Sequence, residues 1–350
     1  MGKTSPVAVA ALVLAACTGE HPHEATETAT DSQGSIVTVS ASAGTAGDET
    51  ASAGTATGSA DTGSAATGNA DSSDGGLKFD LVAPDEPNDT MVDEGCTKVD
   101  FLFVIDNSNS MATNQGELVA SFPEFVAAIE STLTEVESFH VGVVTSDAYQ
   151  FNAPGCTAMG ALVTQTGGVN SSNAVCNPFA DGFRYMTDAD DLDNDFACAA
   201  LVGTAGANDE QMMAGALGAI SDPLNMAGGC NDGFLRDDAL LVAVFISDED
   251  DPGSSLVGSP GDPNTWLAAF VAAKGVVENT VVLTLTRGSP GNVCGGAQGS
   301  EVDGTRLMQF AQLFGANGFM GDICAASFGP FFDGAVDVIA SACDNFEPPR

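Results

Sequence analysis

Residues 98–111 read KVDFLFVIDNSNSM, and the rest of the chain can be arranged around this stretch. Residues 99–105 are apolar apart from Asp100, a composition typical of a strand that is buried on both faces of a parallel sheet. The polar residues that follow mark the end of the strand. The stretch therefore predicts a central strand whose carboxyl end opens into a turn before a helix.

Three oxygen-bearing side chains, Asp106, Ser108 and Ser110, follow this strand at alternate positions. One carboxylate and two hydroxyls can converge on a point at the carboxyl edge of the sheet, and such oxygen ligands suit a hard cation such as Mg²⁺. The alternative is a serine-rich turn in which Asp106 or a serine only caps the next helix. A buried strand before the motif and a helix after it favour the cation site.

Apolar runs predict further strands at residues 139–145, 239–247 and 280–286, with short ones at 183–186 and 318–323. Helical spacing predicts helices at 116–133, 188–201, 209–220, 265–274, 304–314 and 328–342. Residues 146–188 form a long insertion without clear periodicity. Strands that alternate with helices predict an α/β fold, a doubly wound, mostly parallel sheet with helices on both faces. Ligands of such sheets bind outside the carboxyl ends of the strands.

The Asp-x-Ser-x-Ser motif after a hydrophobic strand resembles the metal-ion-dependent adhesion site of von Willebrand factor type A domains, which are Rossmann-like binding modules. The resemblance extends over residues 96–343. In that family a Gly-Thr turn before a helix supplies a third hydroxyl, and a second carboxylate follows a later strand; Thr204 and Asp248 occupy the matching places. Ser247 and Glu249 replace the usual Thr and Gly, which leaves open whether Asp248 alone or a larger acidic cluster faces the metal.

The resemblance implies a binding or adhesion module in which Mg²⁺, or another divalent cation such as Mn²⁺ or Ca²⁺, grips an acidic residue of a protein partner. Its implied metal residues are Asp106, Ser108, Ser110, Thr204 and Asp248. The three hydroxyls would touch the cation directly, and the two carboxylates would act largely through water. Two alternatives stay open: Thr204 as a helix cap or turn residue, and residues 247–251 as a solvated acidic turn.

Residues 188–195, DADDLDND, also suggest a calcium loop because acidic residues alternate there. An EF-hand loop would need Gly at its sixth position and Glu at its twelfth, where this chain has Phe196 and Val202. We therefore expect these acids to form the first turn of a helix, where the helix dipole favours negative charge.

The N-terminus predicts an exported lipoprotein. Lys3 precedes an apolar segment, residues 7–16, that is shorter than the about 20 residues needed to span a bilayer. Leu14-Ala15-Ala16-Cys17 resembles a bacterial lipobox, so residues 1–17 are predicted to be a signal peptide that ends at an acylated Cys17. The protein would then be anchored in the bacterial cell envelope, at the outer membrane or cell surface rather than the inner membrane. The alternative is an ordinary signal peptide with an incidental cysteine.

Residues 18–85 are rich in Ala, Gly, Ser, Thr and Asp and predict a disordered tether, which leaves residues 86–350 as the type A-like domain. The chain carries 48 acidic against 9 basic residues, a formal net charge of −39. Such a charge repels phosphate backbones and anionic lipid surfaces, so it excludes nucleic acid as a partner and leaves the lipid anchor as the predicted membrane contact.

Eight cysteines follow Cys17, and an even number in an exported chain predicts four disulfides. We expect Cys96 to pair with Cys343 and so join the two ends of the domain. Local loop closure predicts Cys156 with Cys176 and Cys294 with Cys324. Cys198 and Cys230 remain as the fourth pair by elimination.

Two other functions are compatible with the sequence. A metal-dependent hydrolase at the same edge would need a general base, and Glu249 is the available carboxylate. The histidines favour it little, because His21 and His23 lie in the tether and His140 lies in a predicted strand. A domain without metal could serve as a structural spacer. We expect a binding module and not an enzyme.

Overall fold

The computed structural model describes residues 95–253, 258–288 and 303–348. The predicted signal peptide (1–17), the acylated Cys17 and the tether (18–85) lie outside the described residues. Within the described ranges, no helix combines the length and apolar character needed to cross a membrane.

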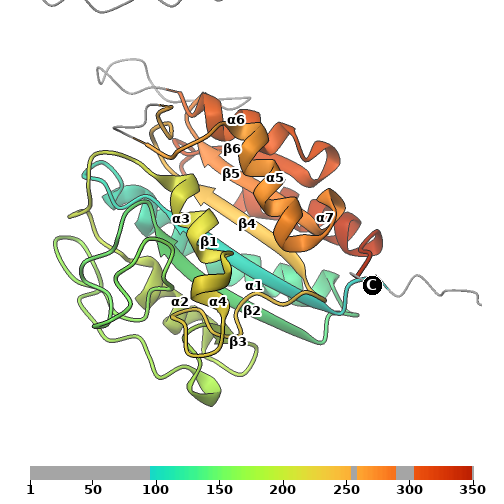
Figure 1. Cartoon of the computed structure of the whole chain (residues 1–350), viewed down its shortest axis with the longest axis horizontal. Helices are drawn as coiled ribbons and strands as arrows, with labels where there is room; N and C mark the ends of the chain where they lie inside the picture. Colours follow the sequence, from blue (N-terminus) through green and yellow to red (C-terminus); the bar gives the residue numbers. More distant parts are fainter. Residues whose placement is uncertain (1–94, 254–257, 289–302, 349–350) are drawn as a thin grey trace, which may run out of the picture. The chain divides into compact units, whose positions relative to one another are not determined.

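The described strands form one six-stranded sheet in the order β3-β2-β1-β4-β5-β6 (Figure 1). Their bounds are β1 (Lys98–Ile105), β2 (Ser138–Thr145), β3 (Met186–Thr187), β4 (Leu240–Ile246), β5 (Thr280–Thr286) and β6 (Gly318–Asp322). All neighbouring strands are parallel except β3, which pairs antiparallel with β2 at the edge. Every residue of β4 and β5 is buried, as expected for strands covered on both faces. The predicted doubly wound α/β fold is confirmed.

Helices cover both faces of this sheet. They are α1 (Ala112–Thr132), α2 (Leu192–Ala200), α3 (Met212–Ala219), α4 (Asp222–Asn225), α5 (Pro263–Lys274), α6 (Thr305–Gln312) and α7 (Gly329–Asp344), with 3-10 turns at Ala180–Gly182, Val277–Asn279 and Gly315–Asn317. Helices α1, α2 and α7 share one apolar core with the sheet, and α3, α5 and α6 share the other. Alternate residues of β1 divide between them, with Phe103 in the first core and Leu102 in the second.

The predicted elements differ from the observed ones mainly at their ends. Helix α1 starts at Ala112 and not at the predicted residue 116. Its first turn contains the polar Gln115, which is buried because its side chain is hydrogen-bonded to Asp106 O and Gly203 O. The short edge strand is Met186–Thr187 and not 183–186, since a 3-10 turn bends the chain just before it. Helix α2 carries Asp193 and Asp195 in its first turn, where the sequence predicts acidic residues.

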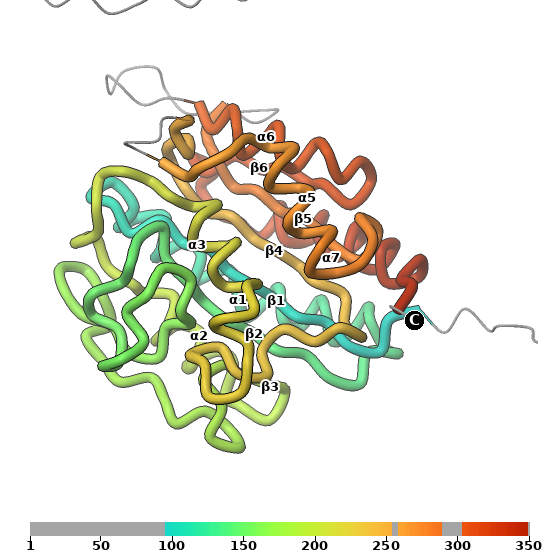
Figure 2. The backbone as a smooth tube through the Cα atoms, in the orientation of Figure 1, coloured from blue at the N-terminus to red at the C-terminus, as the bar shows by residue number. Residues whose placement is uncertain are grey.

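Three disulfides connect described cysteines. Cys96–Cys343 is confirmed, and Figure 2 shows the start of β1 beside the end of α7. The predicted pairs Cys156–Cys176 and Cys198–Cys230 are wrong, because the bonds are Cys156–Cys230 and Cys176–Cys198. The insertion folds back onto α2 and onto the segment before β4, so its cysteines meet partners outside the insertion. Cys294, the predicted partner of Cys324, lies outside the described residues.

Peptide mapping of the non-reduced protein should therefore recover Cys96–Cys343, Cys156–Cys230 and Cys176–Cys198 as linked peptides. Replacing both cysteines of a pair with Ala should lower the free energy of unfolding, and the loss should be larger for the disulfide that closes the longer loop. We expect about 3 kcal/mol for Cys176–Cys198 and about 5 kcal/mol for Cys96–Cys343. Denaturant titration of the two double variants measures the difference. A linked Cys156–Cys176 peptide would contradict this connectivity.

A buried ion pair lies near the start of β1. Asp100 is fully buried and accepts hydrogen bonds from Arg236 Nε at 2.7 Å and from the Arg236 backbone N–H at 2.8 Å. Burial raises the pKa of Asp100 to about 6, and the Arg236 guanidinium opposes that shift. His140 lies beside the pair, with Nδ1 2.8 Å from the carbonyl oxygen of Phe234, and burial lowers its pKa to about 4. His140 is therefore a neutral structural side chain.

We expect Arg236→Met to destabilise the domain by about 3–5 kcal/mol, because it leaves the Asp100 carboxylate buried without its cation. The matched control is Lys98→Met, which breaks the more exposed ion pair with Asp238 and should cost less than about 1 kcal/mol. Urea denaturation of both variants separates the two cases. Equal losses would show that burial of the Asp100 pair does not matter.

Candidate functional site

The candidate site lies where the strand order reverses. The chain goes from β1 to β2 on one side and later returns through β4 on the other side of β1, which makes the β1–β4 junction a topological switch point. Pairing continues to the strand ends, since Asp106 N–H donates to Ile246 O at 3.0 Å. The loops after β1 and β4 therefore start side by side at the carboxyl edge of the sheet.

Asp106 joins these two loops. Its carboxylate is fully buried and accepts the Ser108 backbone N–H at 2.7 Å on Oδ1 and the Ser247 hydroxyl at 2.7 Å on Oδ2. Burial raises the pKa of Asp106 to about 6, hydrogen bonds from the Ser108 backbone, the Ser247 side chain and the Ser108 side chain oppose this shift, and the nearby charge of Asp248 adds to it. Because both carboxylate oxygens already accept protein donors, Asp106 is better placed to act on a cation through water than to ligate it directly.

The other oxygen ligands form a hydrogen-bonded row above Asp106. Ser108 Oγ lies 3.2 Å from Ser110 Oγ, and Ser110 Oγ donates to Asp248 Oδ1 at 2.8 Å. Ser108 and Asp248 are buried, whereas Ser110 is exposed. The structure thus brings four of the five predicted metal residues together, with one of them open to a ligand from outside.

Gln115, on the first turn of α1, connects the turn at residues 203–206 to the end of β1. Its Nε2 donates to Asp106 O and to Gly203 O, both at 2.9 Å, and its Oε1 accepts the Gly203 N–H at 3.0 Å. One buried amide therefore holds the turn at residues 203–206 against the end of β1.

Thr204, the fifth predicted residue, lies in that turn and is bound to the insertion. Its Oγ1 accepts a hydrogen bond from Asn170 Nδ2 at 2.9 Å. The turn itself approaches β1 closely: Gly206 N–H donates to Asn107 O at 2.9 Å, and a Cβ on Gly206 would lie 2.4 Å from Asn107 Cγ. Glycine is favoured there because a Cβ would have to displace the buried side chain of Asn107.

The acidic run after β4 divides into two parts. Asp250 accepts the backbone N–H of Arg306 at 3.0 Å, and so caps the start of α6. Asp251 is fully buried and accepts the Met213 N–H at 2.8 Å and the Ser259 hydroxyl at 2.6 Å. Asp250 and Asp251 thus accept hydrogen bonds from the protein itself, so residues 248–251 do not act as one cation-binding cluster.

Glu210 is a buried acid near Asp106 and Glu249 that the sequence pattern does not single out. It is 2% exposed, and its Oε1 has no hydrogen-bond partner. Burial, and then the negative charges of Asp106 and Glu249, raise the pKa of Glu210 to about 9. The sequence placed this acid in the first turn of a helix, but α3 begins only at Met212. A buried carboxyl beside two other acids cannot be recognised from spacing alone.

No cluster of three or more His, Cys, Asp or Glu side chains arranged to hold a metal occurs in the described part of the chain. A cation at this edge would therefore depend on the serine hydroxyls together with the carboxylates. The orphaned oxygen of Glu210 and the row from Ser108 to Asp248 supply oxygen ligands of the kind that a hard cation prefers.

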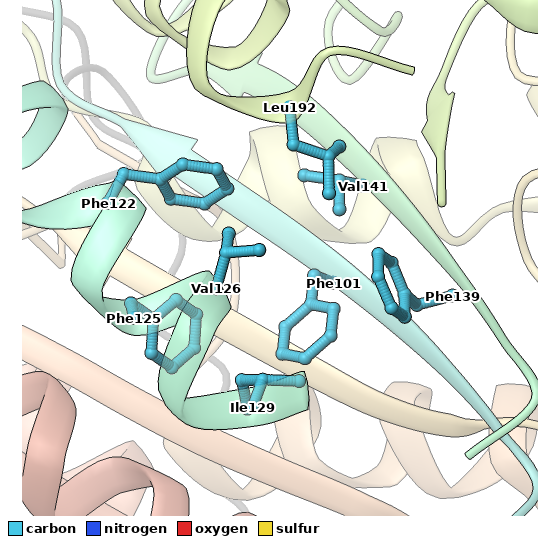
Figure 3. Close-up of a pocket in the computed structure, with 8 residues that line it drawn as sticks. All are labelled: Phe101, Phe122, Phe125, Val126, Ile129, Phe139, Val141 and Leu192. Atoms are coloured by element: carbon cyan, nitrogen blue, oxygen red, sulfur yellow. The ribbon is translucent and has the colours of Figure 1, made fainter. Parts of the chain in front are cut away.

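An apolar pocket lies on the α1 face of the sheet (Figure 3). Its lining consists of Phe101, Phe122, Phe125, Val126, Ile129, Phe139, Val141 and Leu192. The side chains come from β1, β2, α1 and α2 and belong to one of the two cores or pack against it. With no polar group in its lining to orient a ligand, the pocket is part of the packing and not a candidate site.

No family model and no curated protein sequence matches this chain. Among solved structures, the chain is similar to proximal thread matrix protein 1 from the mussel byssus, with 13% identity, a TM-score of 0.38 and coverage of 70% of this chain and 49% of that chain. It is also similar to the pilus adhesin SpaC of Lactobacillus rhamnosus GG, with 12% identity, a TM-score of 0.36 and coverage of 71% and 30%. The chain spans about half the length of the first and less than a third of the second. Similarities this low carry no functional inference.

The Gln115 contacts generate a prediction. Gln115→Leu leaves the buried N–H and C=O of Gly203 without partners, so we expect a loss of about 2–4 kcal/mol in unfolding free energy. Faster hydrogen exchange of the Gly203 amide should report that the turn has loosened. The exposed Gln312→Leu is the control and should change neither quantity. Unchanged exchange at Gly203 in a folded Gln115→Leu would contradict the assigned role.

Proposed function

We propose that the described domain is a von Willebrand factor type A-like binding module that grips an acidic group of a protein partner through Mg²⁺ or a similar divalent cation. The observation that carries the proposal is the row Ser108, Ser110 and Asp248 above the buried Asp106, at the switch point between β1 and β4. The same edge is where open α/β sheets bind their ligands.

The residues of the proposed site would have different roles. Asp106 holds the loop after β1 through the Ser108 N–H and the loop after β4 through Ser247, and so fixes the spacing between the ligands. Ser108 and Ser110 contribute neutral hydroxyls, which withdraw less positive charge from a cation than carboxylates do. A bound cation supplies a point of attraction for an external carboxylate. The exposed Ser110 marks where that carboxylate would approach.

Binding is favoured over hydrolysis by the side chains around the edge. His140, the histidine that the structure describes, sits in β2 and is hydrogen-bonded to the Phe234 carbonyl, so it does not serve as a base at this site. Glu249 lies beside Glu210, another carboxyl, and the Ser247 hydroxyl next to its backbone is already hydrogen-bonded to Asp106. We therefore propose no catalytic step.

We also propose that the protein is exported and lipid-anchored through Cys17. Two observations support this: the short apolar segment that ends in Leu14-Ala15-Ala16-Cys17, and the disulfides of the domain, which persist in oxidising compartments.

The test is Asp106→Ala in the full-length protein. Calorimetric titration with Mg²⁺ and Mn²⁺ should show binding to the wild type and a loss of at least tenfold in affinity in the variant. Capture of an envelope partner should require the cation, and removing it with EDTA should cost about 2–5 kcal/mol, a factor of roughly 30 to several thousand.

The matched control is Glu130→Ala, an exposed acid on α1, which should bind the cation and the partner as the wild type does. Circular dichroism should show that both variants fold, because the site lies at the edge of the sheet and not in its cores. A folded wild type that binds neither cation, and whose partner binding survives EDTA, would reject the mechanism and favour the spacer function.

A further inference from the structure

We propose that Glu210 supplies a carboxylate ligand to the cation of this site, at the place that the family resemblance gives to Thr204. This inference rests on the proposed function, since it assigns a residue to the same cation. It would make the site richer in negative charge than a site built on three hydroxyls.

The first argument is the unsatisfied oxygen. Glu210 is only 2% exposed, and its Oε1 accepts no hydrogen bond. A buried polar atom without a partner costs about 1–3 kcal/mol, and more where it carries charge, so such atoms in native proteins usually have a functional reason. A cation ligated by Oε1 would remove this cost.

The second argument is the sign of the surrounding charges. The ionisable groups that act on Glu210 are Asp106 and Glu249, both acids, and Glu249 also shares a side-chain hydrogen bond with it, which leaves Oε1 as the oxygen without a partner. Buried carboxyls are normally paired with a basic side chain or a metal ion. Here Asp106 lies in the loop after β1 and Glu249 in the loop after β4, and the same two loops carry the serine hydroxyls and Asp248. A divalent cation between these loops would balance the negative charges of Asp106, Glu249 and Glu210 together.

The third argument is the contrast with Thr204. The Thr204 hydroxyl already accepts the Asn170 amide at 2.9 Å, so one of its two acceptor positions is used within the protein, whereas Glu210 Oε1 has none in use. Glu210 is also held firmly by its neighbours in the chain: Ala207 N–H donates to Asp147 Oδ2 at 3.1 Å, and Gln211 N–H donates to Ser146 O at 3.0 Å. The segment before α3 is thereby pinned to the end of β2, with Glu210 between the two anchors.

A carboxylate in place of a hydroxyl changes how the cation is held. Affinity for Ca²⁺ and similar hard cations rises with the number of charged ligands. With Glu210 Oε1 as a direct ligand beside the serine hydroxyls, a divalent ion would be held more tightly before any partner carboxylate binds. Loss of the Glu210 charge should therefore weaken cation binding itself and not only partner binding.

The experiment compares Glu210→Gln with Thr204→Val, both close in shape to the native residue, in the full-length oxidised protein. Mn²⁺ binding is followed by electron paramagnetic resonance, and Mg²⁺ and Ca²⁺ binding by calorimetry. We expect Glu210→Gln to lower the affinity at least tenfold and Thr204→Val to change it less than twofold. Thermal unfolding with and without EDTA supplies the second readout: Glu210→Gln should be at least as stable as the wild type in EDTA and should gain less from added cation.

The outcomes separate this inference from the proposed function. Cation binding that is lost in Asp106→Ala but intact in Glu210→Gln overturns the role of Glu210 and leaves the site in place. A larger loss in Thr204→Val than in Glu210→Gln restores the hydroxyl ligand and also overturns it. A wild type that binds no divalent cation rejects both proposals. Marked destabilisation of Glu210→Gln in EDTA would assign Glu210 a structural role instead.

Discussion

The carboxylate of Asp106 is the constraint on which the carboxyl edge of the sheet depends. It is fully buried, and the donors that stabilise it come from two different loops, the Ser108 N–H after β1 and the Ser247 hydroxyl after β4. Charge-assisted hydrogen bonds of this kind are roughly twice as strong as neutral ones, so both loops are drawn to one point. The row that ends at Asp248 keeps its spacing because Asp106 fixes the loops beneath it.

The sheet allows this edge to be polar because its stability comes from elsewhere. Strands β4 and β5 are buried along their whole length, and two separate apolar cores lie on the faces of the sheet. The long insertion is connected to the rest of the domain at two places. The Cys176–Cys198 disulfide joins it to α2, and its Asn170 side chain donates a hydrogen bond to Thr204. A rigid scaffold with specialised loops can hold several oxygen ligands in place without contributing them from the core.

The parts of the fold that were predictable are those that local composition determines. The continuous apolar runs gave β1, β4 and β5 to within a residue or two, and the placing of Asp106 and Asp248 directly after two such strands predicted that they would meet. The disulfides of the insertion depend on how 43 residues (146–188) fold back, which spacing does not encode. Burial of Glu210 is likewise a tertiary property, invisible in an acidic stretch before a helix.

The overall charge of the protein gives a reason for a cation in the proposed mechanism. With a formal net charge of −39, the chain repels an acidic partner at distances beyond contact, although salt screens this repulsion within about 10 Å. A basic side chain could attract a partner carboxylate, but the chain has only 9 Lys and Arg residues. In the proposed mechanism, Asp106 and Glu210 would instead help to hold a divalent ion and present its charge at one point. Attraction would then operate only at the site, so an acidic surface and an acidic ligand would be compatible, and specificity would follow from the geometry of the row proposed to hold the ion.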